Sequence, residues 1–275
     1  MLNTRRLIVF TDLDGTLLDQ DTLSYQASLP TMRKLQALKM PVILCSSKTR
    51  AEVEPLWREL GLEEPFIIEN GGAVCFTPNS LPAPLESARF DGRLNVLELG
   101  SPIGELRAGL AEAARRLHVR VRSFSNLSAK DIVELTGLSR QQAQAAAQRE
   151  YDEPFLIDEP GRERMLATAL RMKGFTVTKG ERFFHLSRGS DKGKAARLLT
   201  DLYSKDGSSY ITVGLGNSAS DLALLLAVER AILIRNPDRS WDSTITQHIP
   251  GIRKTMRIGP EGWAESVEKL LAEVA

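Results

Sequence analysis

The stretch Leu7-Ile8-Val9-Phe10-Thr11-Asp12-Leu13-Asp14-Gly15-Thr16-Leu17-Leu18 decides the fold of this chain. Its four consecutive apolar residues predict a buried strand of a parallel sheet. Two carboxylates, a glycine and a threonine follow at the strand's carboxyl end, where open α/β sheets bind their ligands. Asp12 and Asp14 are two residues apart, so an extended backbone directs both side chains to one face. Because two anions this close repel each other, the pair predicts a site for a hard cation such as Mg²⁺.

Length and composition describe an ordinary globular protein. At 275 residues the chain is long for one domain, so we expect a core with a sizeable insertion or two domains. The 36 basic and 35 acidic residues nearly cancel, and no overall charge attracts nucleic acid or anionic lipid. We expect no signal peptide and no membrane span. Cys45 and Cys75 lack metal-binding spacing, so we expect reduced thiols in a cytoplasmic protein.

Polar residues follow a second buried strand, predicted over residues 41–45. This strand ends in Ser46-Ser47-Lys48-Thr49, just before a helix predicted over 49–60. Hydroxyls and a cation before a helix N-terminus suit an anion such as phosphate. The alternative is that Thr49 only caps the helix and Lys48 is solvated.

Two more polar sites lie in the last third of the chain. Lys192 opens a helix that is predicted to end near residue 203, and residues 210–213 predict another strand. That strand ends in Gly214-Leu215-Gly216-Asn217-Ser218-Ala219-Ser220-Asp221, and Asn217 and Asp221 share a face if a helix begins early. Out of context, Lys192 would be a solvated lysine and Asp221 a carboxylate favoured by the helix dipole.

The middle of the chain predicts a second α/β unit. Helices are expected over 106–117 and 162–173 and from about 128 and 139, with strands over 118–124 and 151–157. Residues 175–178 and 183–186 predict a hairpin. Prolines at 78, 82 and 84 indicate a linker over 77–85. Because the core pattern resumes near residue 188, we expect a core of residues 1–84 and 188–275 with a cap, 85–187, inserted into it.

The order of these motifs carries a resemblance. The string Asp12-Leu13-Asp14-Gly15-Thr16-Leu17 after a strand, then Ser46, Lys192 and Asp221, resembles the haloacid dehalogenase superfamily over about residues 7–76 and 188–275. The resemblance implies a Rossmann-like parallel sheet with helices on both faces and an inserted α/β cap.

Five strings are also similar to one phosphatase family, the mannosyl-3-phosphoglycerate phosphatases. They are Ser46-Ser47-Lys48-Thr49, Glu69-Asn70-Gly71-Gly72, Glu150-Tyr151-Asp152-Glu153-Pro154-Phe155, Gly180-Glu181-Arg182-Phe183-Phe184-His185 and Gly259-Pro260-Glu261-Gly262-Trp263. The expected substrate is a small phosphorylated sugar acid, and the expected assembly is a monomer or homodimer. The sequence does not separate mannosyl from glucosyl substrates, because these differ in the orientation of one hydroxyl.

The resemblance implies phosphate-ester hydrolysis through an aspartyl-phosphate. Asp12 is the expected nucleophile and Asp14 the general acid and base, with Thr16 orienting Asp14. Ser46 would donate to the phosphoryl oxygens, and Lys192 would neutralise charge. The residues expected around Mg²⁺ are Asp12, Asp14, Asn217 and Asp221.

Substrate choice is expected to depend mainly on the cap, which excludes water when it closes. The substrate-binding candidates are cationic or polar: Ser47, Lys48, Arg122, Glu153, Lys179, Arg182 and His185. Each has a plainer interpretation. Arg122 would then be an exposed strand residue, and His185 a hydrogen-bonded core histidine.

Asn217 departs from the family pattern, which has an acidic residue there. An amide keeps a carbonyl oxygen but removes one negative charge from the metal site, which predicts weaker Mg²⁺ binding. Two alternatives to the expected enzyme stay open. One is a phosphatase of another small sugar phosphate, and the other is a catalytically silent sugar-phosphate sensor.

Overall fold

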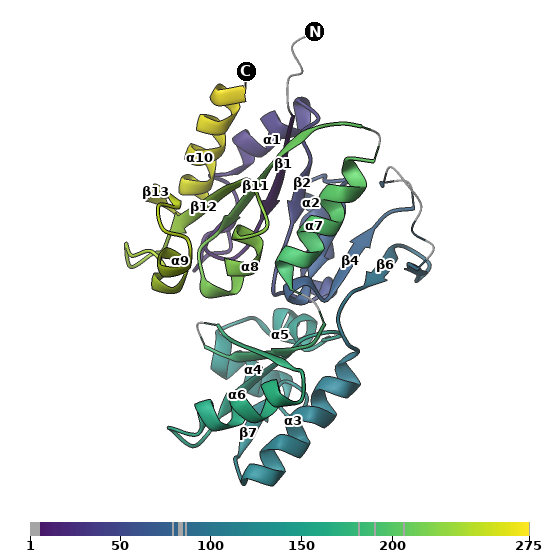
Figure 1. Cartoon of the computed structure of the whole chain (residues 1–275), viewed down its shortest axis with the longest axis vertical. Coiled ribbons are helices and arrows are strands. Elements are labelled where there is room, and N and C mark those ends of the chain that lie inside the picture. The colour runs from purple at the N-terminus through teal and green to yellow at the C-terminus, as the bar shows by residue number, and fades with distance from the viewer. Residues whose placement is uncertain are drawn as a thin grey trace.

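The computed structural model describes residues 6–274 except 79, 82–84, 86, 181, 190 and 206. Figure 1 shows two units along the long axis, with both termini in the same unit. The strands of the described residues form three sheets. The linker predicted over 77–85 lies partly outside the described residues. No helix in the described part is both long and apolar enough to cross a bilayer.

The main sheet is fully parallel, in the order β13-β12-β11-β1-β2. Its strands are β1 (Arg6–Thr11), β2 (Val42–Leu44), β11 (Tyr210–Gly216), β12 (Arg230–Arg235) and β13 (Arg253–Ile258). β1 lies between β2, which follows it in the first part of the core, and β11, which belongs to the part of the core after the cap. The order therefore changes direction at β1, and such a switch point creates a crevice at the carboxyl ends of the strands.

Alternate residues of β1 face opposite layers of helices. Leu7 and Val9 pack with residues of α1, α2 and α10, whereas Ile8 and Phe10 pack with residues of α7 and α8. These helices are α1 (Leu29–Ala37), α2 (Arg50–Glu59), α7 (Lys192–Tyr203), α8 (Leu222–Leu225) and α10 (Gly259–Val274). Both faces of the strand are thus buried, which explains its unbroken apolar run.

A small antiparallel sheet extends this core. It has the order β3-β4-β6-β5 and consists of β3 (Phe66–Ile68), β4 (Ala73–Phe76), β5 (Arg89–Phe90) and β6 (Asn95–Glu98). A parallel bridge between Cys45 and Ile67 joins it to the end of β2. Both cysteines are buried and free, as expected. β5 and β6 fall inside the predicted insertion but pair with the preceding segment, so the boundaries 84 and 187 stay a prediction.

The second unit, which we call the cap, has its own antiparallel sheet, β7-β8-β10-β9. Its strands are β7 (Val121–Ser123), β8 (Glu153–Ile157), β9 (Thr176–Lys179) and β10 (Phe184–Ser187). Its helices are α3 (Ile103–Leu117), α4 (Ala129–Thr136), α5 (Arg140–Ala146) and α6 (Glu163–Met172). β9 and β10 form the predicted hairpin. α5 lies against α2 of the core, and β9 lies beside the turn η2 (Ala219–Asp221).

Two elements, α9 (Ser243–His248) and β13, were not predicted from the sequence. β13 has the sequence RKTMRI, in which Thr255 is buried and four residues are exposed. An edge strand of this kind carries little hydrophobic signal.

Trp263 of α10 packs against the end of β1. It is fully buried, and its Nε1 donates to Thr11 Oγ1 over 3.0 Å. The Thr11 hydroxyl in turn donates to the carbonyl of Asp12 over 2.8 Å. α10 thereby fixes the backbone that carries the first acidic residue.

We expect Trp263→Phe to lower the free energy of unfolding by about 2 kcal/mol, because it removes a buried hydrogen bond and leaves a small cavity. Urea denaturation measures this change. Trp241→Phe is the matched control, since the Trp241 indole also donates a hydrogen bond, in its case to the Thr255 carbonyl, but the side chain is only partly buried. An equal or larger loss in the control would contradict the importance of the Trp263 contact.

Candidate active site

Lys192 is the centre of the site. Its side chain is 1% exposed, and its ammonium lies 2.6 Å from Asp12 Oδ1 and 2.6 Å from Asp221 Oδ1. Although burial lowers the pKa of Lys192, the two carboxylates raise it above its ordinary value. Burial, with repulsion from Asp221, raises the pKa of Asp12 to about 7 even though Lys192 lowers it. The site therefore has more buried negative charge than one ammonium compensates.

α7 delivers Lys192 to this position. Asp191 caps the helix by accepting from Lys194 N–H over 2.8 Å. A Cβ on Gly193 would come within 2.2 Å of the Ala223 carbonyl, so the first turn of α7 packs backbone to backbone against α8. The strand that precedes Lys192 is β10 of the cap, so Lys192, unlike Asp12, does not follow a strand of the parallel sheet.

Asp221 and Asn217 are fixed by the turn after β11. Asp221 Oδ2 accepts the N–H groups of Asn217 and Ser218, over 3.0 and 3.2 Å. Asn217 Nδ2 donates to Asn236 Oδ1 over 2.9 Å, and Asn217 Oδ1 accepts from Thr16 Oγ1 over 3.4 Å. This corrects one expectation: the Thr16 hydroxyl contacts Asn217 rather than Asp14.

Gly15 makes room for this arrangement. Its φ of 69° is left-handed, and a Cβ there would lie 2.5 Å from Asn217 Nδ2. The first motif therefore needs glycine at this position both for its turn and for the approach of Asn217.

Asp14 pairs with Lys48, which comes from the loop after β2. Its Oδ2 is 2.9 Å from Lys48 Nζ, and Glu52 Oε1 is 3.7 Å from the same ammonium. Although burial lowers the pKa of Lys48, these two carboxylates raise it. Asp14 Oδ1 is buried and has no hydrogen-bond partner among the described residues. One carboxylate oxygen is therefore held in place while the other is left for a reacting group.

The loop after β2 presents Ser46 to the same space. Ser46 is buried, and its Oγ accepts the Lys48 N–H over 3.1 Å, which leaves the hydroxyl hydrogen free to donate elsewhere. Thr49 caps α2 in a reciprocal box with Glu52. The structure thus makes Thr49 a helix cap, as the plainer interpretation held, but Lys48 is paired rather than solvated.

The oxygen donors fit a hard cation. Asp12 and Asp221 each lie within hydrogen-bond reach of one ammonium, and the negative charge of the site exceeds what that ammonium neutralises. Among the described residues, His, Cys, Asp and Glu side chains form no three-ligand group. A complete set would therefore include a backbone carbonyl, expected from Asp14, or the Asn217 amide.

Of the predicted cap residues, His185 and Lys179 lie on the β9–β10 hairpin, whereas two arginines are exposed. His185 Nδ1 lies 2.7 Å from Asp152 Oδ1, and Lys179 ends the strand beside η2 with its ammonium 5.9 Å from the Phe184 ring centre. Arg182 and Arg122 are exposed and engaged inside the cap, with the Leu135 carbonyl and with Asp158.

The structure corrects the prediction that Glu153 binds the substrate. Glu153 is fully buried, and its oxygens accept from Arg107 Nε over 3.0 Å and from Ser125 N–H over 2.8 Å. Both oxygens are used to hold the cap together, so the structure does not offer this carboxylate to sugar hydroxyls.

Comparison with known proteins shows which family the chain belongs to. Residues 9–82 match the family described as haloacid dehalogenase-like hydrolase. The chain is 36% identical over 269 residues to the glucosyl-3-phosphoglycerate/mannosyl-3-phosphoglycerate phosphatase of Methanococcoides burtonii, with 97% of each covered. It is 34% identical to the phosphatase of that name from Persephonella marina, with 98% of each covered. The chain belongs to the haloacid dehalogenase-like hydrolase family and is a phosphatase.

The fold of this phosphatase is also found among solved structures. The crystal structure of Thermoplasma acidophilum 0175 matches it with a TM-score of 0.68 at 20% identity, over 98% of this chain and 100% of the other. The predicted parallel sheet with an α/β cap is therefore confirmed.

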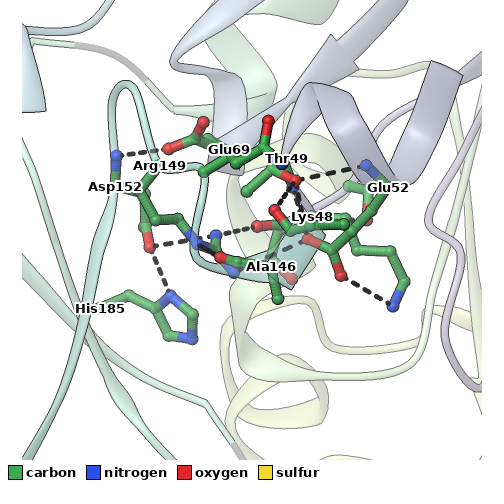
Figure 2. Close-up of polar contacts among 12 residues, drawn as sticks. Lys48, Thr49, Glu52, Glu69, Ala146, Arg149, Asp152 and His185 are labelled. Atoms are coloured by element: carbon green, nitrogen blue, oxygen red, sulfur yellow. Dashed lines mark hydrogen bonds and ion pairs between the residues drawn. The ribbon is translucent and has the colours of Figure 1, made fainter. Parts of the chain in front are cut away.

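Sequence reasoning missed a group of buried charges where the cap meets the core of the phosphatase, shown in Figure 2. Glu69 accepts the N–H groups of Glu150, Tyr151 and Asp152 over 2.8 to 3.1 Å. Burial raises the pKa of Glu69 to about 7, while Arg149 and these amides lower it. The sequence indicated Glu69 only as part of a string similar to the phosphatase family, because its partners are backbone groups that no pattern of residue types reveals.

In the phosphatase, we expect Glu153→Gln to lower the free energy of unfolding by about 1–3 kcal/mol, because Arg107 and the Ser125 N–H lose a buried charged acceptor. Urea denaturation measures the change, and Glu134→Gln is the control because Glu134 is exposed and paired only at 3.7 Å. A variant as stable as the parent would mean that the carboxylate is available to a ligand after all.

Proposed function

We propose that this phosphatase hydrolyses mannosyl-3-phosphoglycerate and glucosyl-3-phosphoglycerate with Mg²⁺, releasing phosphate and the glycosylglycerate. Two relatives that match nearly the full length of the chain carry both substrates in their names. The observation that carries the reaction is the buried Lys192 between Asp12 and Asp221, with Asp14 paired to Lys48 of the loop that also carries Ser46. The cofactor and the residue roles are part of the proposal.

The first step transfers the phosphoryl group to Asp12. A carboxylate oxygen of Asp12 attacks phosphorus, and the bond from phosphorus to the glycerate oxygen breaks. Asp14 starts this step protonated, and its Oδ1, which has no hydrogen-bond partner among the described residues, gives the proton to the leaving oxygen. Ser46 donates its free hydroxyl hydrogen to a phosphoryl oxygen, and Lys192 offsets the charge on nucleophile and phosphate.

The second step releases phosphate. Asp14, now ionised, accepts a proton from water as that water attacks the aspartyl-phosphate, and the Asp12 carboxylate is restored. Lys48 holds the other oxygen of Asp14 at 2.9 Å, so the carboxyl group keeps one orientation in both steps.

Mg²⁺, when bound by the Asp12 carboxylate, the Asp14 carbonyl and Asp221, supplies further positive charge that polarises the phosphoryl group. Asn217 is placed beside these donors with its amide held by Thr16 and Asn236.

The cap supplies the remaining recognition. His185, oriented by Asp152, and Lys179, at the strand beside η2, are the cap residues best placed for the sugar and the glycerate carboxylate. Ser47 and Lys48 are the substrate-binding residues that the core contributes. Arg182, at the hairpin, remains a candidate whose present contact is with the Leu135 carbonyl.

We expect Mg²⁺-dependent phosphate release from both glycosyl phosphoglycerates to exceed release from glycerol phosphate and glucose 6-phosphate. Asp12→Asn removes the nucleophile and lowers kcat by at least about a thousandfold. Asp201→Asn, an exposed position on α7, is the control.

Three outcomes are informative. Release only from the generic compounds would overturn the substrate while keeping the chemistry. Tight binding of the glycosyl phosphoglycerates without turnover would favour the sensor, and full activity of Asp12→Asn would refute the mechanism.

Asn217→Asp restores an acidic donor beside Asp221. We expect it to lower the Mg²⁺ dissociation constant about tenfold, because a hard cation binds more tightly as ligand charge increases. Asn236 can present its amide nitrogen to the new carboxylate by rotating its side-chain amide. Calorimetric titration with Mg²⁺ alone measures the change, with Asn217→Ala as the comparison; an unchanged constant for Asn217→Asp would place residue 217 outside the metal site.

A further inference from the structure

The loop Ser46–Thr49 has three successive carbonyl groups that need partners. Asn70 N–H donates to the Ser46 carbonyl over 2.9 Å, and Glu69 N–H donates to the Lys48 carbonyl over 3.0 Å. Both donors belong to the core. They fix the two ends of the short segment that presents Ser46 and Lys48 to the site.

The middle carbonyl is satisfied from the cap. Arg149 Nη1 donates to the Ser47 carbonyl over 2.7 Å, and Arg149 Nε donates to the Ala146 carbonyl over 2.8 Å. The guanidinium also lies over the ring of Phe124, 5.4 Å from its centre. One planar side chain thus bonds to the core loop and to the end of α5 at the same time.

Charge keeps Arg149 in this place. Its side chain is 7% exposed, and it lies 4.0 Å from Glu52 and 3.8 Å from Asp152. The next three residues of the chain donate their N–H groups to Glu69, as Figure 2 shows in part. The contact is therefore reciprocal, because the core carboxylate of Glu69 accepts cap amides while the cap guanidinium of Arg149 donates to a core carbonyl.

We propose that Arg149 is a positioning residue that couples seating of the cap to assembly of the phosphate-binding loop. With the cap seated, all three carbonyls of the loop are bonded, and Ser46 and Lys48 are held against the nucleophile and the general acid. When the cap lifts, Ser47 loses its partner and the loop becomes looser. The proposal uses the proposed function only in assigning phosphate binding to this loop.

The contacts separate this role from direct substrate binding. Arg149 is almost fully buried, and two of its nitrogens already donate to backbone carbonyls. It also differs from the substrate candidates Lys179 and His185, which extend from the β9–β10 hairpin. A loop that Arg149 positions serves every phosphate ester, whatever its leaving group.

The test compares Arg149→Lys with the parent. Lysine keeps the charge but cannot bridge the Ser47 and Ala146 carbonyls as the guanidinium does. We measure the dissociation constant of inorganic phosphate by calorimetry with Mg²⁺ present, kcat for p-nitrophenyl phosphate, and the melting temperature. We expect phosphate affinity and kcat each to fall about tenfold, because a loop misplaced by a fraction of an ångström loses catalytic alignment.

Arg171→Lys is the matched control, since Arg171 also donates to a backbone carbonyl, that of Val177, but wholly within the cap. We expect it to change neither phosphate affinity nor kcat. Unchanged phosphate affinity and kcat in Arg149→Lys would overturn the proposal. So would a loss confined to the glycosyl phosphoglycerates, because Arg149 would then act on the sugar acid alone.

A second variant and the binding measurement cover the cases in which Arg149→Lys does not fold or the proposed substrate is wrong. If Arg149→Lys does not fold, Glu69→Gln weakens the same seat from the core side, and the same losses are expected of it. Phosphate binding is read without turnover, so a failure of the proposed substrate leaves the outcome for Arg149 measurable.

Discussion

The structure depends on one buried ammonium held between two carboxylates. Lys192 lies 2.6 Å from both Asp12 and Asp221, and because all three are buried, removing one partner would leave an uncompensated buried charge. The three residues come from different parts of the chain: the first strand, the helix that follows the cap, and the turn after β11. Satisfying their charges therefore requires that the two halves of the core close around β1 in one register, with α7 packed backbone to backbone against α8.

The same constraint explains how the cap is attached. A Cβ on Gly71 would lie 2.2 Å from the Asp191 carbonyl, so the loop that begins with Glu69 touches the residue just before Lys192. Glu69 and Asn70 both have left-handed backbone, with φ of 47° and 57°. Each such residue costs about 1–3 kcal/mol, which is sustained only where the surroundings over-determine it. Here the surroundings are the cap amides on one side and the loop Ser46–Thr49 on the other.

Sequence was sufficient where side-chain chemistry and hydrophobic pattern coincide. The apolar run before Asp12 indicated a strand buried on both faces, and the order of Asp12, Ser46, Lys192 and Asp221 indicated which residues the fold gathers. It was insufficient where the partner is backbone. Arg149 follows an alanine- and glutamine-rich helix and bonds to two carbonyls, which no pattern of residue types reveals. Glu153 misled for the opposite reason, because an acidic residue in a cap motif suggests a ligand, yet its oxygens are used by Arg107 and Ser125.

The contact from Trp263 through Thr11 to the Asp12 carbonyl also bears on how the protein is made. All the acidic and basic residues of the site precede α10 in the sequence and leave the ribosome before it. Until α10 follows, the face of β1 that carries Leu7 and Val9 lacks one of its covering helices, and Thr11 lacks its indole donor. A nascent chain can thus contain Asp12, Asp14, Lys192 and Asp221 before α10 covers this face of β1. The indole that supports Thr11 and the Asp12 backbone is therefore synthesised after all the charged residues of the site.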